Sequence, residues 1–137
     1  MTTLEINRIN TKDVNIEDAT PAMQQYLQTK KEYQDSILLY RMGDFYETFF
    51  EDAVRMSKEL EITLTARDCG NVLGKIPLAG IPAKALDGYL EKLVQKNIKV
   101  AVCEQLEDPK FAKGIVKRGV TRVITAGTIT ENNLLDK

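Results

Sequence analysis

Histidine is absent from this 137-residue sequence, and cysteine occurs only twice, as Cys69 and Cys103. Histidine is the commonest general base and the commonest metal ligand, so its absence removes the simplest designs for a hydrolase or a metal site. The two cysteines form no CxxC pair, and we interpret both as reduced thiols, with Cys103 buried. A chain of this length can bury about two thirds of its extended surface and needs no disulfide bridges.

An excess of one charge sign and a long apolar run are also missing. The 19 lysines and arginines nearly cancel the 20 aspartates and glutamates. A stand-alone nucleic-acid binder usually shows a basic excess, because phosphate neutralisation supplies most non-specific affinity. Any DNA binding by this chain alone is therefore expected to be weak. No apolar run approaches the ~20 residues of a membrane span, and the N-terminus lacks the layout of a signal peptide. We expect an intracellular, cytoplasmic protein with no membrane contact.

The order of apolar runs and turn residues predicts a single compact α/β domain with a mixed β-sheet flanked by helices. We expect a flexible leader over residues 1–19, the domain over 20–126, and a truncated linker toward a following domain over 127–137. The predicted helices begin at residues 21, 50 and 84 and end near 33–35, 59 and 96. The predicted strands span 37–42, 45–48, 62–65, 77–82, 99–103 and 119–126, with a loop at 68–74.

Local signals support these boundaries. Thr20 and Pro21 combine an N-cap with a proline at the first helical position. Gly43-Asp44 is a turn signal between two strands and predicts a hairpin. Asn97 is a suitable C-cap for the last helix. The residues expected to face the core from the first and last helices are Met23, Tyr26, Leu27 and Lys30, and Leu86, Tyr89, Leu90, Leu93 and Val94.

Two segments approach the signatures of catalytic sites without completing them. The stretch from Gly70 to Ile76 is one residue short of a phosphate-binding loop and has Ile76 where a hydroxyl is required, so we interpret it as a surface loop. Asp108-Pro109-Lys110 follows a strand in the manner of a metal-dependent nuclease, but no second acidic ligand is evident. A solvated turn explains it better.

The densest acidic group consists of Asp44, Glu47, Glu51 and Asp52. Hard-metal sites need several converging oxygens. Glu51 and Asp52 are explained more simply as acids at a helix N-terminus, where they complement the helix dipole.

The aromatic residues are concentrated in one segment. Four of the nine aromatics lie between Phe45 and Phe50. If residues 45–48 are extended, Phe45 and Glu47 project from the same face, about 6.6 Å apart. A ring beside a carboxylate is a poor core pair, because burying the carboxylate is costly, but it is a good recognition pair. The pattern alone favours a plainer alternative, in which Phe45 packs into the core and Glu47 lies at its solvent edge.

Several segments in the same order resemble the MutS family of DNA mismatch-recognition proteins. The signature is Tyr40-Arg41-Met42-Gly43-Asp44-Phe45-Tyr46-Glu47-Thr48-Phe49. Further matching segments, extending over about 20–129, are 51–53, 64–67, 76–82, 89–94, 100–109 and 122–129. The resemblance implies the N-terminal mismatch-recognition domain (domain I) of a longer protein.

The resemblance also implies roles for individual residues. Phe45 would wedge into the minor groove and stack on a mispaired base in kinked DNA, and Glu47 would hydrogen-bond the same base. The residues that would line the groove nearby are Met42, Arg67, Pro77, Leu78 and Lys84. Ala83 and Lys84 stand where the family commonly has tyrosine and histidine. Leu78 replaces a common methionine, and Ala126 a frequent proline.

Cofactors and partners follow from the same resemblance. This fragment is expected to be non-catalytic and to need no cofactor, whereas the full-length protein would be an ATPase that uses ATP and Mg through parts absent here. The expected partners are mismatched double-stranded DNA and, for the full-length homodimer, downstream mismatch repair proteins at the nucleoid. The basic stretch 110–122 is open to three interpretations: a phosphate contact, a solvated edge or a docking face.

Two other function classes compete with this interpretation. One is a metal-dependent nuclease with Asp44, Glu47 and Asp108 as ligands, which likeness of fold does not exclude. The other is a protein-interaction domain that uses the aromatics of 45–50 as a hot spot.

Overall fold

The computed structural model describes residues 5–128. Its strands are β1 (Ile37–Met42), β2 (Phe45–Phe49), β3 (Thr65–Asp68), β4 (Lys75–Pro82), β5 (Val100–Gln105) and β6 (Arg118–Ile124). Its helices are α1 (Pro21–Glu32), α2 (Phe50–Leu60), α3 (Gly70–Leu73) and α4 (Leu86–Gln95), with short 3-10 turns η2 (Thr11–Asp13), η3 (Ile16–Asp18), η4 (Ala83–Ala85) and η5 (Pro109–Phe111).

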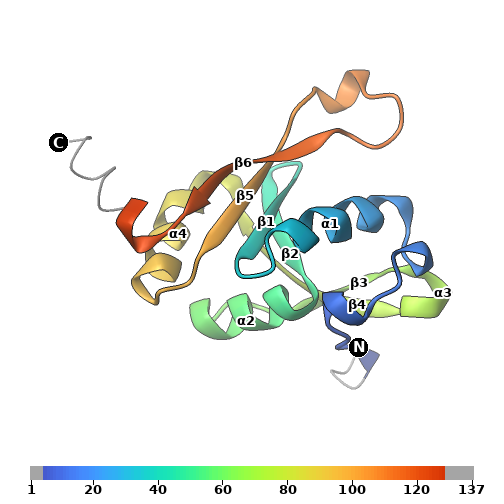
Figure 1. The fold of residues 1–137 in the computed structure, drawn as a ribbon, viewed down its shortest axis with the longest axis horizontal. Coiled ribbons are helices and arrows are strands. Elements are labelled where there is room, and N and C mark those ends of the chain that lie inside the picture. The colour runs from blue at the N-terminus through green and yellow to red at the C-terminus, as the bar shows by residue number, and fades with distance from the viewer. Residues whose placement is uncertain (1–4, 129–137) are drawn as a thin grey trace.

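The six strands form one mixed sheet in the order β3-β4-β2-β1-β5-β6 (Figure 1). β1 and β5 run parallel, and the other neighbouring pairs are antiparallel. The predicted fold class is confirmed. So is the predicted hairpin, in which β1 and β2 pair from Tyr40–Glu47 to Met42–Phe45 around the Gly43-Asp44 turn.

Helices cover both faces of the sheet (Figure 1). On the face that we call the α2/α4 face, side chains such as Ile37, Leu39 and Tyr46 pack against α2 and α4. On the opposite α1 face, alternate strand residues such as Tyr40 and Phe49 pack against α1 and the segment before it. This division follows from the two-residue period of a strand.

Helix α1 begins and is anchored as its sequence predicts. The Thr20 hydroxyl accepts a hydrogen bond from the Met23 amide at 3.4 Å. The predicted inward stripe of Met23, Tyr26, Leu27 and Lys30 is buried. Buried Lys30 forms an ion pair with Asp52 of α2 at 2.8 Å, and the Asp52 carboxylate also accepts from the Leu38 amide at 3.0 Å. This contact ties α1, β1 and α2 together.

Two predicted elements were wrong. Residues 62–64, predicted as strand, are not in the sheet; Ile62 and Leu64 pack against the α2/α4 core, and β3 begins only at Thr65. The predicted loop 68–74 contains the short helix α3. In both places a β-branched or glycine-rich pattern was outweighed by contacts with distant residues.

The ends of α4 also differ in detail from the prediction. The segment from Ala83 to Ala85 is a 3-10 turn, and the α-helix starts at Leu86 rather than at Lys84. Asn97 adopts a left-handed conformation with φ of 61°, and its amide donates to the Val94 carbonyl at 2.9 Å. This geometry matches its predicted role in ending the helix.

Residues 5–19, predicted as a leader, contact the domain at several points. Ile6 bridges to Lys75, and the Asn7 side-chain amide donates to the Leu73 carbonyl at 2.9 Å. The Thr11 amide and hydroxyl donate to the Glu51 carboxylate at 2.8 and 2.5 Å. At the other end, the predicted linker beyond Thr128 lies outside the described residues.

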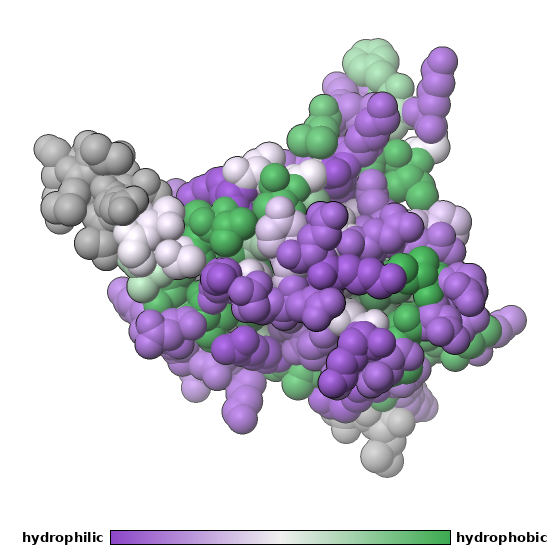
Figure 2. Space-filling view, in the orientation of Figure 1, coloured by the Kyte–Doolittle hydropathy of each residue, from purple (hydrophilic) through white to green (hydrophobic). Residues whose placement is uncertain are grey.

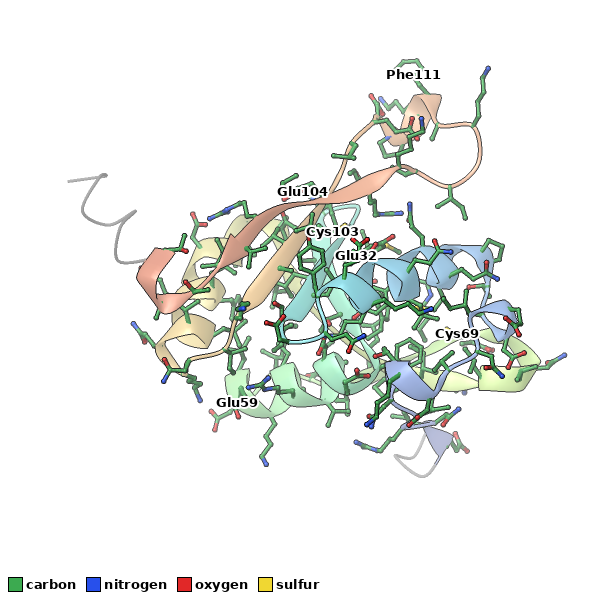
Figure 3. All side chains as sticks on the ribbon, viewed as in Figure 1. Glu32, Glu59, Cys69, Cys103, Glu104 and Phe111 are labelled. Carbon is green, nitrogen blue, oxygen red and sulfur yellow. The ribbon has the colours of Figure 1, made fainter. Side chains whose placement is uncertain are left out.

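Between β5 and β6 the chain forms an arm over residues 106–117 that projects beyond the sheet (Figure 1). Hydrophobic side chains are exposed along it: Leu106, Ile115 and Phe111, whose exposed fraction is 80%. Figure 2 shows hydrophobic surface on this arm among hydrophilic side chains, and Figure 3 places Phe111 near its end.

Candidate nucleic-acid interface

Phe45 is the first residue of β2, directly after the Gly43-Asp44 turn. Gly43 has φ of 60°, a conformation that glycine adopts at little cost. The Phe45 ring is 48% exposed and belongs to neither core cluster. The plainer alternative from the sequence, in which Phe45 packs into the core, is therefore not what the structure shows.

Glu47 lies on the same face of β2 as Phe45, half-buried between Tyr40 of β1 and Gly80 of β4. A Cβ atom at Gly80 would lie 3.4 Å from the Glu47 Cγ, so glycine leaves room for this side chain. Among residues 5–128, the Glu47 carboxylate has no hydrogen-bond or ion-pair partner. Burial raises the pKa of Glu47, and the nearby charge of Arg67 partly offsets that rise.

The turn that carries Phe45 is braced on the α2/α4 face by Arg41 and Glu104. The Arg41 Nε donates to the Gly43 carbonyl at 2.6 Å. The Arg41 guanidinium lies 5.1 Å from the centroid of the Tyr46 ring and 3.7 Å from the Glu104 carboxylate. The Tyr46 hydroxyl donates to the same carboxylate. Figure 3 shows Glu104 on β5 where this strand passes the β1–β2 turn.

The α1 face has a different brace, Arg118 of β6. Its Nε donates to the Arg41 carbonyl at 2.9 Å, and one terminal nitrogen lies 3.4 Å from the Met42 sulfur. The other terminal nitrogen donates to the Gln25 side chain at 3.0 Å. The guanidinium lies 4.8 Å from the centroid of the Tyr40 ring. Arg118 is therefore fully engaged, whereas Lys110, Lys113, Lys117 and Arg122 of the same basic stretch are exposed.

A pocket of about 210 Å³ opens on the α1 face. Aromatic side chains of α1, β1 and β2 line it, together with Arg67 and Arg118. Its lining residues are Ala22, Met23, Tyr26, Tyr40, Met42, Phe49, Arg67, Ile115, Val116 and Arg118. The Arg67 guanidinium lies 5.8 Å from the centroid of the Phe49 ring.

The structure brings most of the predicted site residues together. Met42 and Arg67 line the pocket on the α1 face, and Leu78 pairs with Phe49 on the same face. Lys84 is exposed on η4, two residues after Pro82, the β4 residue that pairs with Phe45. Pro77 is buried on the opposite face of β4, because successive strand residues alternate.

Sequence reasoning did not single out the side chains that brace the turn. In the sequence, Arg118 is one of several basic residues in the stretch 110–122, and Glu104 is one residue of a segment that resembles the family. Neither has a local pattern that predicts its contact, because Glu104 reaches a residue 58 positions away and Arg118 one 77 positions away. Arg41 did stand in the signature segment, which was the one available signal.

The residues of the nuclease alternative do not converge. Asp108 caps η5 by accepting from the Lys110 amide at 2.9 Å, and it lies in the arm. In the separate acidic group 44–52, Asp52 is paired with Lys30, and Glu51 accepts hydrogen bonds from Thr11. Within residues 5–128, no three His, Cys, Asp or Glu side chains are grouped so that they could hold a metal ion. In the same range, no helix has the length and apolar character that crossing a membrane requires.

The family described as MutS domain I matches residues 20–133. The chain belongs to the MutS family. It is 61% identical over 120 residues to the DNA mismatch repair protein MutS of Syntrophomonas wolfei, a match over 88% of this chain and 14% of that protein. It is 59% identical over 117 residues to MutS of Alkaliphilus oremlandii, a match over 85% of this chain and 13% of that protein.

These MutS relatives are much longer than the chain described here, which covers 13–14% of their length. The match begins at Thr20, the N-cap of α1, and includes every strand of the sheet. The resemblance predicted from the sequence is thereby confirmed. The exposed ring, the half-buried carboxylate and the two arginine braces are all within the matched region of this MutS domain.

Proposed function

We propose that this MutS domain recognises mispairs in double-stranded DNA by inserting Phe45 into the minor groove. The observation that carries the proposal is the exposed Phe45 ring on a braced turn, while Phe49 and Phe50 of the same aromatic segment are buried. The relatives at 59–61% identity bear the name DNA mismatch repair protein MutS, which supports the same function.

The physical basis of selectivity is the weak stacking of a mispair. Kinking and unstacking a duplex costs less at a mispair than at a matched step. An inserted apolar wedge costs a few kcal/mol of stacking, which ring–base contact and the larger interface of a bent duplex offset. Stacking of a base on an aromatic ring contributes ~1–3 kcal/mol. Because every base has a π-face, this mode is largely indifferent to base identity, as a detector of many mispairs requires.

Glu47 has a different role in this proposal. An ionised carboxylate is repelled by the phosphates beside a groove, so it must either be protonated or accept a hydrogen bond from a base. Burial in the free domain already raises the pKa of Glu47, and contact with DNA would raise it further. An acid in this position marks a mispair that offers a partner and penalises paired bases that offer none.

Neighbouring residues would complete the interface. Met42, Arg67 and Leu78 flank Glu47 on the α1 face, and exposed Lys84 is placed to approach a phosphate. Pro77 would act through the shape of β4, since it is buried on the other face. The net charge of −1 provides little general attraction to DNA, so the isolated domain would bind weakly.

Further functions would reside in parts of the protein beyond this chain. We propose that the longer protein binds ATP and Mg, forms a homodimer and recruits downstream repair proteins, as its family membership suggests. In this division of roles, the domain described here is a non-catalytic reader of DNA in the cytoplasm, at the nucleoid.

The decisive experiment compares heteroduplex and homoduplex affinity in a full-length protein that contains this domain. Phe45→Ala is expected to abolish the preference for a mispair, and Glu47→Gln to change it. The control is Phe111→Ala, which removes another exposed ring from the arm. An unchanged preference in Phe45→Ala would contradict the wedge, and an unchanged preference in Glu47→Gln would remove the role of the carboxylate.

A further inference from the structure

The β1–β2 turn extends past the support of its neighbour β5. Tyr40 is the last β1 residue that pairs with β5, opposite Cys103, whereas the pairing of β1 with β2 continues to Met42 and Phe45. The turn therefore projects with one side unsupported by strand pairing. Inserting a ring between stacked bases costs a few kcal/mol. A turn without further support would change its conformation instead of inserting the ring.

The Arg118 guanidinium occupies this unsupported side. Its Nε donates to the Arg41 carbonyl at 2.9 Å, in the place where a strand amide would otherwise be the donor. A second nitrogen lies 3.4 Å from the Met42 sulfur, one residue before the turn. Arg118 thus holds the two β1 residues that precede Gly43-Asp44.

The guanidinium itself is held in place from α1 and β1. Gln25 accepts from Arg118 at 3.0 Å, and its own side-chain amide donates to the Val116 carbonyl at 3.0 Å. The Tyr40 hydroxyl donates to the same Gln25 oxygen. The Arg118 guanidinium is planar, and each of its three nitrogens has a fixed partner. It therefore connects β6 rigidly to the turn, which a lysine ammonium would not do.

We propose that Arg118 is a positioning residue for mispair recognition. It fixes the position of the β1–β2 turn that presents Phe45 and keeps this turn rigid. This inference rests on the proposed function of Phe45 as a wedge. Preorganising a binding element lowers the cost of ordering it on contact with its ligand. Since all three guanidinium nitrogens are engaged within the protein, Arg118 acts through the turn rather than through a phosphate.

The test is a double-mutant cycle in a full-length protein that contains this domain, with affinities measured for a mispaired and a matched duplex. Arg118→Met is expected to lower the preference for the mispair about tenfold and to change the matched-duplex affinity little. In a Phe45→Ala background the same substitution is expected to have no further effect on the preference. Arg122→Met is the matched control, because it removes an exposed arginine from the same strand.

Each alternative outcome has a clear meaning. A loss of affinity for both duplexes, in both backgrounds, would show a phosphate contact and overturn the proposal. So would an unchanged preference in Arg118→Met. If Phe45→Ala itself left the preference intact, the proposed function would fail first, and the role of Arg118 with it.

A second measurement applies to the 137-residue chain and does not depend on DNA. Arg118→Lys keeps the charge and one donor but loses the planar fork. NMR relaxation is expected to show lower backbone order at Gly43 and Asp44 in this variant than in the unsubstituted chain, with the order of α2 unchanged. Equal order at the turn in both proteins would overturn the proposed rigidity.

Discussion

Phe45 and Phe49 lie on the same face of the same strand, yet their exposed fractions are 48% and 1%. Helix α1 makes the difference. The Tyr26 ring packs edge-on against Phe49 with centroids 4.9 Å apart, whereas Phe45 lies outside both core clusters. One strand thus provides a core residue at the end that α1 covers, which we call the covered end. It provides a candidate recognition residue at the other end, which we call the open end.

The acidic residues follow the same division. Asp52, at the covered end, is buried with Lys30 and the Leu38 amide as partners. Glu47, at the open end, has no such partner among residues 5–128. A folded protein seldom leaves a half-buried carboxylate unpaired without a functional reason. The contrast indicates that groups at the covered end stabilise the fold, while groups at the open end, on the function proposed above, are left available for DNA.

The largest expected effect comes from truncating the two phenylalanines. Phe49→Ala is expected to lower the free energy of unfolding by about 3–5 kcal/mol, because it leaves a cavity beneath α1. Phe45→Ala is expected to change it by less than about 1 kcal/mol, since the ring is already half in water. Urea unfolding followed by circular dichroism measures both. Equal losses in the two variants would end the distinction between the covered and open ends.

The next effect concerns the buried ion pair at the covered end. Lys30→Met is expected to destabilise the domain by about 3 kcal/mol, because Asp52 then remains buried without a countercharge. Adding Asp52→Asn should recover part of the loss, since a neutral amide still accepts from the Leu38 amide. Thermal unfolding at constant pH compares the single and double variants. A double variant less stable than Lys30→Met would contradict this account.

The smallest expected effect on stability concerns the Glu47 carboxylate at the open end. Burial raises the folded-state pKa of Glu47 above its unfolded value, so the stabilisation from this group is fully present below the unfolded pKa and is lost as pH rises through the folded pKa. Glu47→Gln should therefore stabilise the domain at pH 7 by less than about 1 kcal/mol, with the gain vanishing near pH 4. Urea unfolding at both pH values measures this difference.

The control for that measurement is Glu91→Gln, which neutralises an exposed acid on α4. It is expected to leave stability unchanged at both pH values. If Glu47→Gln destabilised the domain at pH 7, the carboxylate would have a structural partner rather than being held available for DNA.

Much of the fold was determined by local sequence. The Thr20-Pro21 start of α1 and the Gly43-Asp44 turn were predicted correctly, because capping and turn chemistry act over a few residues. The two-residue period of a strand likewise placed Phe45 and Glu47 on one face. The prediction failed at 62–64 and 68–74, where contacts with distant residues outweighed the local β-branched or glycine-rich pattern.

The sequence by itself determined which residues alternate along β2, and the tertiary structure decided what covers each of them. Burial of Phe49 and exposure of Phe45 depend on where α1 crosses the sheet, which no pattern within 45–50 encodes. The Arg118 contact with the Arg41 carbonyl joins residues 77 positions apart. Such contacts form only when the sheet brings distant strands together, because hydrogen bonds act over a few ångströms and sequence periodicity describes only near neighbours.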